Sequence, residues 1–284
     1  MKIFSFAKFT GAGNDFVLLD RQLNPNLEVD MELIRQLCDR RYGIGADGVL
    51  IIEDIERMNF SALYYNADGT SGSLCANGAR CSIEYARLSN RIKDDVATFK
   101  FNGQKYSGKV LSPGFIELKM PAPMLLRYDF KVNLSNNTVN YSFAETGAPH
   151  AVIMINELLE DFSNPKSFYT NLNKVPVKEL GREIRYSREF APNGTNVDFI
   201  KIEDNKIFMR TYERGVEDET FACGTGAVAC AVISHFKNNI KPPIEIFTKM
   251  NEKFIVNFDV ADRRIKNLVL AGAANLVFYG KITI

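Results

Sequence analysis

An internal repeat with a constant spacing of 148 residues constrains the fold of this chain more than any other feature. Five identities recur at that spacing: Phe60 and Phe208, Tyr64 and Tyr212, Cys75 and Cys223, Gly78 and Gly226, and Ala79 and Ala227. A second repeat, with a spacing of 136 residues, pairs Thr10-Gly11-Ala12 with Thr146-Gly147-Ala148. Self-similarity at a fixed spacing is the signature of a repeated architecture. Because the chain has 284 residues, both spacings are close to half its length, and the sequence predicts two similar domains.

Each predicted half contains the same order of a strand, a loop, a cysteine and a helix. The segments are 60–65, Cys75 and 79–88 in the first half, and 206–212, Cys223 and 227–236 in the second. The strands are rich in aromatic and branched residues, and small residues follow each cysteine. We therefore expect both cysteines at or just before a helix N-terminus.

The remaining patterns give domain limits. A helix is expected over 31–41, and strands or hairpins over 99–120, 254–258 and 268–284. The segment Pro121-Ala122-Pro123 is the best boundary, and the last strand is free to return to the first domain. We expect one domain over 1–121 with 272–284, carrying Cys75, and another over 122–271, carrying Cys223.

Composition excludes several classes of protein. A net charge of +1 provides no basic surface for nucleic acid. The apolar run 268–278 is too short to span a membrane, and the N-terminal run is too short for a signal peptide. Five cysteines are an odd number, and no Cys-x-x-Cys occurs, so a disulfide framework and a zinc site are not expected. We expect a cytoplasmic protein that binds neither metal nor membrane.

A cysteine at a helix N-terminus has distinctive chemistry. Unpaired backbone N–H groups and the helix dipole lower the thiol pKa there, and the same groups bind carboxylates. If two such thiols faced one amino acid, one thiolate could remove the α-proton while the other thiol protonated the opposite face. That inversion needs no metal and no pyridoxal phosphate.

The other cysteines fit a structural role. Cys38, Cys81 and Cys230 lie among apolar residues, where a cysteine is usually a small buried side chain. For Cys75 and Cys223 the glycine-rich context and the repeat favour a reactive role. If oxidation joined these two cysteines in a disulfide, neither would retain a reactive thiol.

With these residues in hand, the sequence closely resembles the diaminopimelate epimerases. The resemblance is carried by Lys8–Phe16, Gly43–Gly48, Tyr65–Gly69, Cys75–Cys81, Tyr212–Gly215 and Ala222–Gly226. It implies an α+β fold of two pseudo-symmetric domains, each a β-sheet wrapped around a central helix. It further implies conversion of LL-2,6-diaminopimelate to the meso form without a cofactor, in a homodimer that serves lysine and peptidoglycan precursor synthesis.

The resemblance also assigns roles to residues. It makes Cys75 and Cys223 the two acid/base groups, tuned by His150 and Glu213. The positions that match substrate contacts are Asn14, Asn66, Ala76, Asn77, Asn196, Glu213, Arg214, Gly224 and Thr225. Arg214 suits a distal carboxylate and Glu213 suits an ammonium group. Purely structural roles remain open for four of these residues. Asn66 and Asn196 could stabilise turns, Arg214 could form a surface ion pair, and His150 could serve the packing of the fold.

Three positions depart from the family pattern. Ala148 stands where a substrate-contacting Asn is common, Gly48 where a Gln is often found, and Ala76 where Gly follows the first cysteine. Two rival functions also remain: another two-cysteine racemase, acting on proline or hydroxyproline, and a non-catalytic redox sensor built on the cysteine pair.

Overall fold

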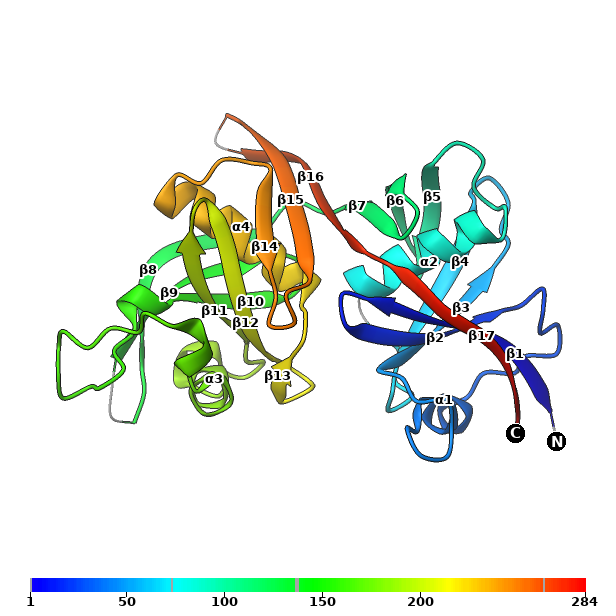
Figure 1. The fold of residues 1–284 in the computed structure, drawn as a ribbon, viewed down its shortest axis with the longest axis horizontal. Coiled ribbons are helices and arrows are strands. Elements are labelled where there is room, and N and C mark those ends of the chain that lie inside the picture. The colour runs from blue at the N-terminus through cyan, green and yellow to red at the C-terminus, as the bar shows by residue number, and fades with distance from the viewer. Residues whose placement is uncertain (1, 73, 136–137, 263) are drawn as a thin grey trace. The chain divides into compact units, whose positions relative to one another are not determined.

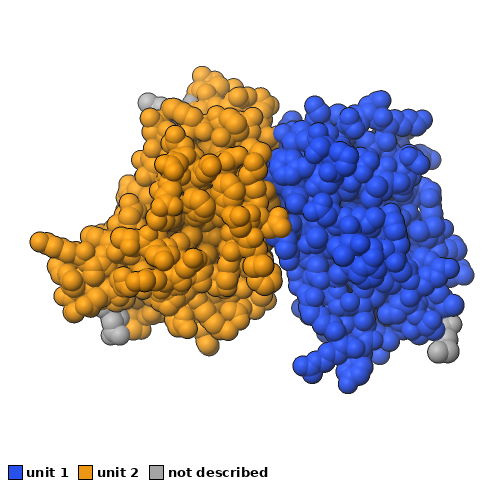
Figure 2. Space-filling view, in the orientation of Figure 1, with its two compact units in different colours: residues 1–119, 271–284 blue, residues 120–270 orange. Residues whose placement is uncertain are grey.

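The computed structural model describes residues 2–72, 74–135, 138–262 and 264–284. The chain divides into two compact units, one of residues 1–119 with 271–284 and one of residues 120–270, coloured separately in Figure 2. We call them unit 1 and unit 2 and describe each by itself.

The described residues of unit 1 form eight strands and two helices, labelled in Figure 1. In chain order they are β1 (Ile3–Gly11), β2 (Asn14–Asp20), α1 (Met31–Cys38), β3 (Gly48–Glu53), β4 (Phe60–Asn66), α2 (Ala76–Leu88), β5 (Val96–Phe101), β6 (Gln104–Ser112), β7 (Phe115–Lys119) and β17 (Asn275–Thr283). The paired strands run β17-β1-β2-β3-β4-β5-β6-β7. The last strand of the chain therefore lies beside the first.

Unit 2 repeats this plan. Its elements are β8 (Leu125–Asn133), β9 (Thr138–Glu145), β10 (Pro149–Met154), α3 (Val177–Arg185), β11 (Asn196–Glu203), β12 (Lys206–Glu213), β13 (Asp218–Thr220), α4 (Gly224–Asn238), β14 (Ile244–Phe247) and β15 (Lys253–Ala261), with short 3-10 turns at 155–157, 172–174 and 188–190. β16 (Arg264–Ala273) crosses the division between the units. The pairing β8-β9-β10-β11-β12-β14-β15 matches that of unit 1 from β17 to β6.

One strand register is the same in both units at the repeat spacing. Phe60 pairs with Phe99 in β4–β5, and Phe208 pairs with Phe247 in β12–β14. The agreement extends beyond the identities seen in sequence, to Phe99 and Phe247. Phe60 stacks on Phe99 with centroids 4.8 Å apart, and Phe208 stacks on Phe247 at 5.4 Å. The repeat is thus a repeat of structure, as predicted.

The central helices α2 and α4 are buried in their units. Residues 76–86 of α2 and 224–234 of α4 are all buried. α2 packs against β1, β2, β3, β4, β6, β7 and β17, while α4 packs against β8, β9, β10, β11, β12, β14 and β15. A helix that is covered on every side needs small or apolar residues all round, and α4 supplies them. Each sheet therefore wraps around one helix, which confirms the predicted fold class (Figure 1).

The outer helices α1 and α3 cover the other face of each sheet. Leu33, Ile34 and Leu37 of α1 share one core cluster with residues of β1, β2 and β3. Leu180 and Ile184 of α3 belong to the corresponding cluster of unit 2. Because these helices bury one face only, they are amphipathic, unlike α2 and α4.

The expected helices are present with shifted ends. α2 and α4 begin at residues 76 and 224, directly after the cysteines, rather than at 79 and 227, and α1 ends at residue 38 rather than 41. The segment 99–120 forms most of β5 to β7. Within the described residues no helix is long and apolar enough to span a membrane.

Candidate functional site

Cys75 is the N-cap residue of α2. Its Sγ accepts a hydrogen bond from Gly78 N at 3.4 Å, so the sulfur caps the first turn of the helix. Its side chain also contacts Asn14 Oδ1 at 3.7 Å. The residue is half-buried. The predicted site residues Asn14 and Cys75, which are 61 positions apart, thus lie together in unit 1.

Asn14 is positioned by a charged cluster at the β1–β2 hairpin. Its Nδ2 donates to Asp47 Oδ2 at 2.6 Å. The neighbouring Asp15 accepts from Lys8 Nζ at 2.6 Å and from Arg40 Nη2 at 2.8 Å. Burial opposes ionisation of Asp15, but these two cations hold its pKa at about 2. The hairpin is therefore clamped by ion pairs.

Asn77 and Ala76 form the first turn of α2. Both side chains are buried, and Asn77 Oδ1 accepts from Arg80 Nη2 at 2.6 Å. Arg80 is itself fully buried, and burial lowers its pKa to about 10. Ala76 is helical and does not adopt a positive φ. The Ala that replaces the family Gly here therefore leaves the backbone N–H available at the helix start.

Asn66 ends β4, and Gly48 opposes it on β3. The Nδ2 of Asn66 donates to Thr70 Oγ1 at 3.0 Å, so its amide takes part in the following turn. A Cβ on Gly48 would lie 2.6 Å from both Tyr64 Cε2 and the Tyr65 carbonyl oxygen. Glycine at position 48 is therefore explained sterically, because the Tyr64 ring occupies the space that a longer side chain would need.

Cys223 is the N-cap residue of α4 and lies in a more enclosed setting. It is 7% exposed, and its Sγ is 3.4 Å from Thr225 Oγ1. Burial raises the pKa of this thiol well above its usual value, and the negative charges of Glu213 and Asp198 add to that rise. The hydrogen bond with Thr225 acts in the opposite direction.

His150 lies beneath the start of α4 and is fully buried. Its Nδ1 is 2.7 Å from Asp198 Oδ2, and its Nε2 is 2.9 Å from Thr225 Oγ1. Asp198 Oδ1 in turn accepts from Thr211 Oγ1 at 2.6 Å. His150 therefore reaches Cys223 through the Thr225 hydroxyl. A continuous series of hydrogen-bond contacts runs from Thr211 to the sulfur.

Gly226 allows this arrangement. A Cβ at this position would lie 2.7 Å from Asp198 Oδ1 and 3.2 Å from His150 Cε1. Contacts under 3.0 Å require a shift of one partner, and here the partners are fully buried. The glycine of the repeated motif thus lets α4 approach the His150–Asp198 pair.

Asn196, Glu213 and Arg214 lie around the ends of β11 and β12. Asn196 is buried; its Nδ2 donates to Pro149 O at 2.9 Å, and its Oδ1 accepts from Arg214 N at 2.8 Å. Asn196 therefore ties the start of β10 to the end of β12. The half-buried Glu213 is the last residue of β12 and acts electrostatically on Cys223.

Each unit thus gathers its own share of the predicted residues. Unit 1 brings Asn14 and Cys75 together, with Ala76 and Asn77 following in the same helical turn. Unit 2 brings Cys223, Thr225 and His150 together. Two buried residues in unit 2, Asp198 and Thr211, were missed in the sequence. Asp198 could have been noticed as an acid within the apolar strand 196–200, at a position whose equivalent at the repeat spacing is Leu50.

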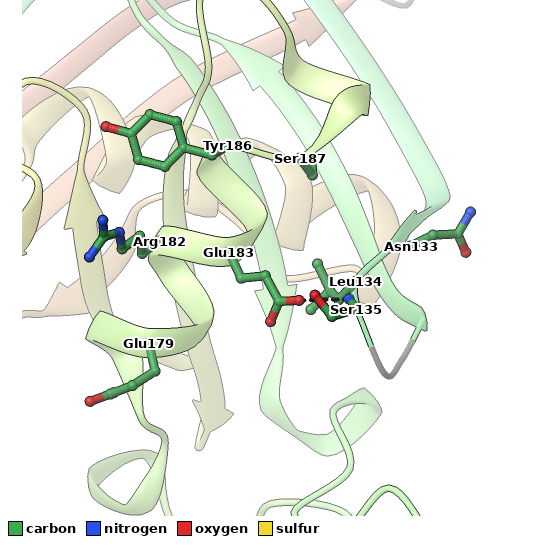
Figure 3. A pocket seen from close by; sticks show the side chains of 8 residues that line it. All are labelled: Asn133, Leu134, Ser135, Glu179, Arg182, Glu183, Tyr186 and Ser187. Carbon is green, nitrogen blue, oxygen red and sulfur yellow. Dashed lines mark hydrogen bonds between the residues drawn. The ribbon is translucent and has the colours of Figure 1, made fainter.

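No group of three or more His, Cys, Asp or Glu side chains suited to a metal ion occurs among the residues that the structure describes. One surface pocket, of about 560 Å³, lies in unit 2 between α3 and residues 133–135. Figure 3 shows Glu183 in this pocket directed toward Ser135, whose backbone N donates to Glu183 Oε1 at 2.7 Å. Its lining contains none of the predicted site residues.

Comparison with known proteins gives one consistent family. The sequence model of the diaminopimelate epimerase family matches residues 6–112 and 142–276. A diaminopimelate epimerase of Chlorobaculum tepidum is 34% identical over 279 residues, covering 97% of this chain and all of the relative. One of Flavobacterium psychrophilum is 33% identical, covering 98% of each chain.

Solved structures share the fold at much lower identity. A hydroxyproline epimerase from Agrobacterium vitis, with bound trans-4-hydroxy-L-proline, matches with a TM-score of 0.70 and 13% identity. The match covers 99% of this chain and 92% of that chain. At this identity the likeness shows a common architecture only.

Proposed function

The chain belongs to the diaminopimelate epimerase family, and we propose that it converts LL-2,6-diaminopimelate to the meso form with Cys75 and Cys223 as the two acid/base groups. One observation carries the proposal. Each unit places a cysteine as the N-cap of its buried central helix, at equivalent positions of a repeated fold. A fold that presents the same cysteine turn twice suits a reaction that needs one thiol on each face of a carbon.

The reaction moves a hydrogen through the substrate α-carbon. The thiolate of one cysteine takes the α-proton, and the C–H electron pair remains on the substrate as a carbanion-like species. The thiol of the other cysteine then protonates the opposite face, which inverts the centre. After turnover the thiol and the thiolate have exchanged places, so the direction of the next turnover is reversed or protons exchange with water.

The reacting carboxylate is held by the first turns of α2 and α4. The N–H groups of Ala76, Asn77, Gly224 and Thr225 precede the first intrahelical bonds, which are donated by Ala79 N to Cys75 O and by Ala227 N to Cys223 O. Such N–H groups lack helical acceptors and carry the positive end of the helix dipole. They stabilise the negative charge that develops as the α-proton leaves.

Arg214 and Glu213 recognise the distal end of the substrate in this proposal. A guanidinium group binds a carboxylate with two parallel hydrogen bonds, and a carboxylate pairs with an ammonium group. Asn14, Asn66 and Asn196 supply amides that hold polar groups of the substrate. His150 and Glu213 tune the thiols, and the chemistry needs no cofactor.

Hydrogen exchange at the α-carbon tests the proposal directly. Reduced protein incubated with LL-diaminopimelate in D2O should yield meso product that carries deuterium at the inverted centre. Activity on proline or hydroxyproline without activity on diaminopimelate would assign the chain to the other racemase class. Absence of exchange with every amino acid tested would instead favour the redox sensor.

We propose a cytoplasmic homodimer as the working form. β17 carries exposed apolar side chains on both faces, with Val277 55% and Tyr279 59% exposed on one face and Phe278 46% exposed on the other. Exposed apolar side chains of this kind suit an interaction surface. The oligomeric state is tested by light scattering on purified protein. A monomer at micromolar concentration would contradict this part of the proposal.

A further inference from the structure

The series Asp198–His150–Thr225–Cys223 lies entirely in unit 2 and is buried along its whole length. The four residues are 0%, 0%, 8% and 7% exposed, respectively. They come from three elements, since Asp198 is on β11, His150 on β10, and Cys223 and Thr225 at the start of α4. The hydrogen-bond contacts that join the first and last members pass through the side chains between them.

Hydrogen-bond roles along the series follow from its acidic end. A carboxylate accepts hydrogen bonds only, so Asp198 requires the proton of neutral His150 to be on Nδ1. The Nε2 atom is then an acceptor, and it takes the hydroxyl proton of Thr225 at 2.9 Å. Thr225 Oγ1 is left with lone pairs toward Cys223, 3.4 Å away, and accepts from the thiol. Thr211 fixes the other oxygen of Asp198 at 2.6 Å.

We propose that Asp198 is a positioning residue that makes His150 the proton acceptor of Cys223, with the Thr225 hydroxyl as the carrier. In the transfer, the S–H bond of Cys223 breaks and a new O–H bond forms at Thr225. The original Thr225 O–H bond breaks and an N–H bond forms at Nε2 of His150. The sulfur keeps its electron pair, His150 becomes an imidazolium ion, and Asp198 remains a carboxylate.

Asp198 has two opposite electrostatic effects on Cys223. Acting directly as a negative charge, it disfavours the thiolate. Acting through His150, it stabilises the imidazolium ion that forms when the thiol is deprotonated. The carboxylate is 2.7 Å from the imidazole and three hydrogen-bond contacts from the sulfur. Because Coulomb energy falls with distance, the effect on His150 exceeds the direct effect.

Two further titratable groups interact by charge with members of the series. Glu213 at the end of β12 acts on the thiol by charge, and Cys230 lies further along α4, where Cys223 and Asp198 both act on it. Neither is a member of the series. Replacing Glu213 by Gln therefore serves as the control for the loss of a negative charge alone.

The experiment measures the reactivity of Cys223 without any substrate. In full-length protein carrying Cys75→Ser, the rate of alkylation at Cys223 is followed against pH by mass spectrometry of its peptide. The ultraviolet absorbance of the thiolate provides a second readout. Asp198→Asn should shift the thiol titration to higher pH and slow alkylation at neutral pH by about tenfold, the effect of one pKa unit. Glu213→Gln should shift the titration to lower pH.

Thr225 separates transmission through the hydroxyl from general disturbance of the fold. Thr225→Val keeps the shape but removes the hydroxyl, and it should slow alkylation as Asp198→Asn does. Thr225→Ser should restore the rate. If Asp198→Asn shifts the thiol titration of Cys223 to lower pH, as Glu213→Gln does, the transfer through Thr225 is overturned. It is also overturned if Cys223 is alkylated at the same rate in Thr225→Val and Thr225→Ser.

The inference rests on the proposed function only for the catalytic role of Cys223, and its test is independent of turnover. If epimerase activity is absent but the titrations shift as expected, the hydrogen-bond series stands and the proposed function fails. If the protein epimerises its substrate but Asp198→Asn leaves the titration unchanged, the proposed function stands and this inference fails.

Discussion

The two central helices begin in the same way but rest on different supports. In unit 1, Gly78 of α2 lies over Leu50 and Phe16, with a Cβ position 3.1 Å from Leu50 Cδ2 and 3.5 Å from Phe16 Cε1. In unit 2, Gly226 of α4 lies over Asp198 and His150. Leu50 and Asp198 are equivalent at the repeat spacing. The backbone of the cysteine turn is therefore repeated, while the side chains beneath it are apolar in one unit and ionisable in the other.

This difference separates what the fold supplies from what individual residues supply. The helix start and its N–H groups follow from the shared backbone and occur in both units. The electrostatic setting of the sulfur depends on the side chains around it: Cys75 is half-buried beside Asn14, whereas Cys223 is buried beside Thr225. A repeated scaffold thus places two thiols in different surroundings.

Removing either thiol should have the largest effect. Cys75→Ala and Cys223→Ala should each lower kcat/KM for epimerisation by at least about 10³-fold, because in each variant one face of the carbon has no acid/base group. Steady-state kinetics on reduced protein measures the loss. Cys38→Ala is the control, since Cys38 is the last residue of α1 and is packed in the core of unit 1. Activity in either site variant comparable with that of Cys38→Ala would break the pairing of the two units.

Asp15→Asn probes the charged clamp of the hairpin in unit 1. The pKa of Asp15 is lowered from 3.8 to about 2, so its carboxylate stabilises the folded state by about 2 kcal/mol at neutral pH. That contribution is present above about pH 4 and is lost as the pH falls through about 2. The variant should unfold at lower urea concentration at pH 7 but lose less stability on acidification. Asp161→Asn, at an exposed turn of unit 2, is the control. Equal acid sensitivity of Asp15→Asn and the unmodified protein would contradict the clamp.

Alanine at the two repeated glycines compares the supports themselves. Gly226→Ala should destabilise the protein by about 1–3 kcal/mol, because its Cβ overlaps the buried Asp198 carboxylate. Gly78→Ala should cost less than about 1 kcal/mol, since the end of the Leu50 side chain can move aside. Urea unfolding of both variants measures the difference. Equal destabilisation by Gly226→Ala and Gly78→Ala would contradict this difference between the residues beneath α4 and those beneath α2.

Thiol labelling gives the smallest of these effects. At neutral pH an alkylating reagent should modify Cys75 at least about tenfold faster than Cys223, because burial raises the pKa of Cys223 and only the thiolate reacts. Peptide mass spectrometry resolves the two sites. Similar rates at both positions would remove the proposed asymmetry.

Much of the fold could be predicted because its signals are local or repeated. The strands before each cysteine are recognisable from aromatic and branched residues, and the constant spacing relates one half to the other. The helix starts were placed three residues late, since Ala76-Asn77-Gly78 and Gly224-Thr225-Gly226 contain residues of low helix propensity. α3 was not predicted, although Val177, Leu180 and Ile184 have helical spacing.

The site was harder to predict for a different reason. The contact of Cys223 with Thr225 is local and follows from the motif at the start of α4, whereas Cys75 contacts Asn14 from 61 residues away. The partners of His150 come from β11 and α4, 48 and 75 residues away along the chain. Such contacts depend on which strands and helices pack together in the fold, and the local sequence around each residue does not specify that packing.

The position of β17 has a consequence for protein engineering. β17 occupies beside β1 the place that β8 occupies beside β9, yet β8 precedes its partner in sequence and β17 comes last. Lys2 N donates to Ile284 O at 2.6 Å, so the two ends of this order are adjacent. A circular permutant that joins Ile284 to Lys2 and opens the chain between Lys119 and Met120 would encode each half as one uninterrupted segment, with its strands in the same order in both.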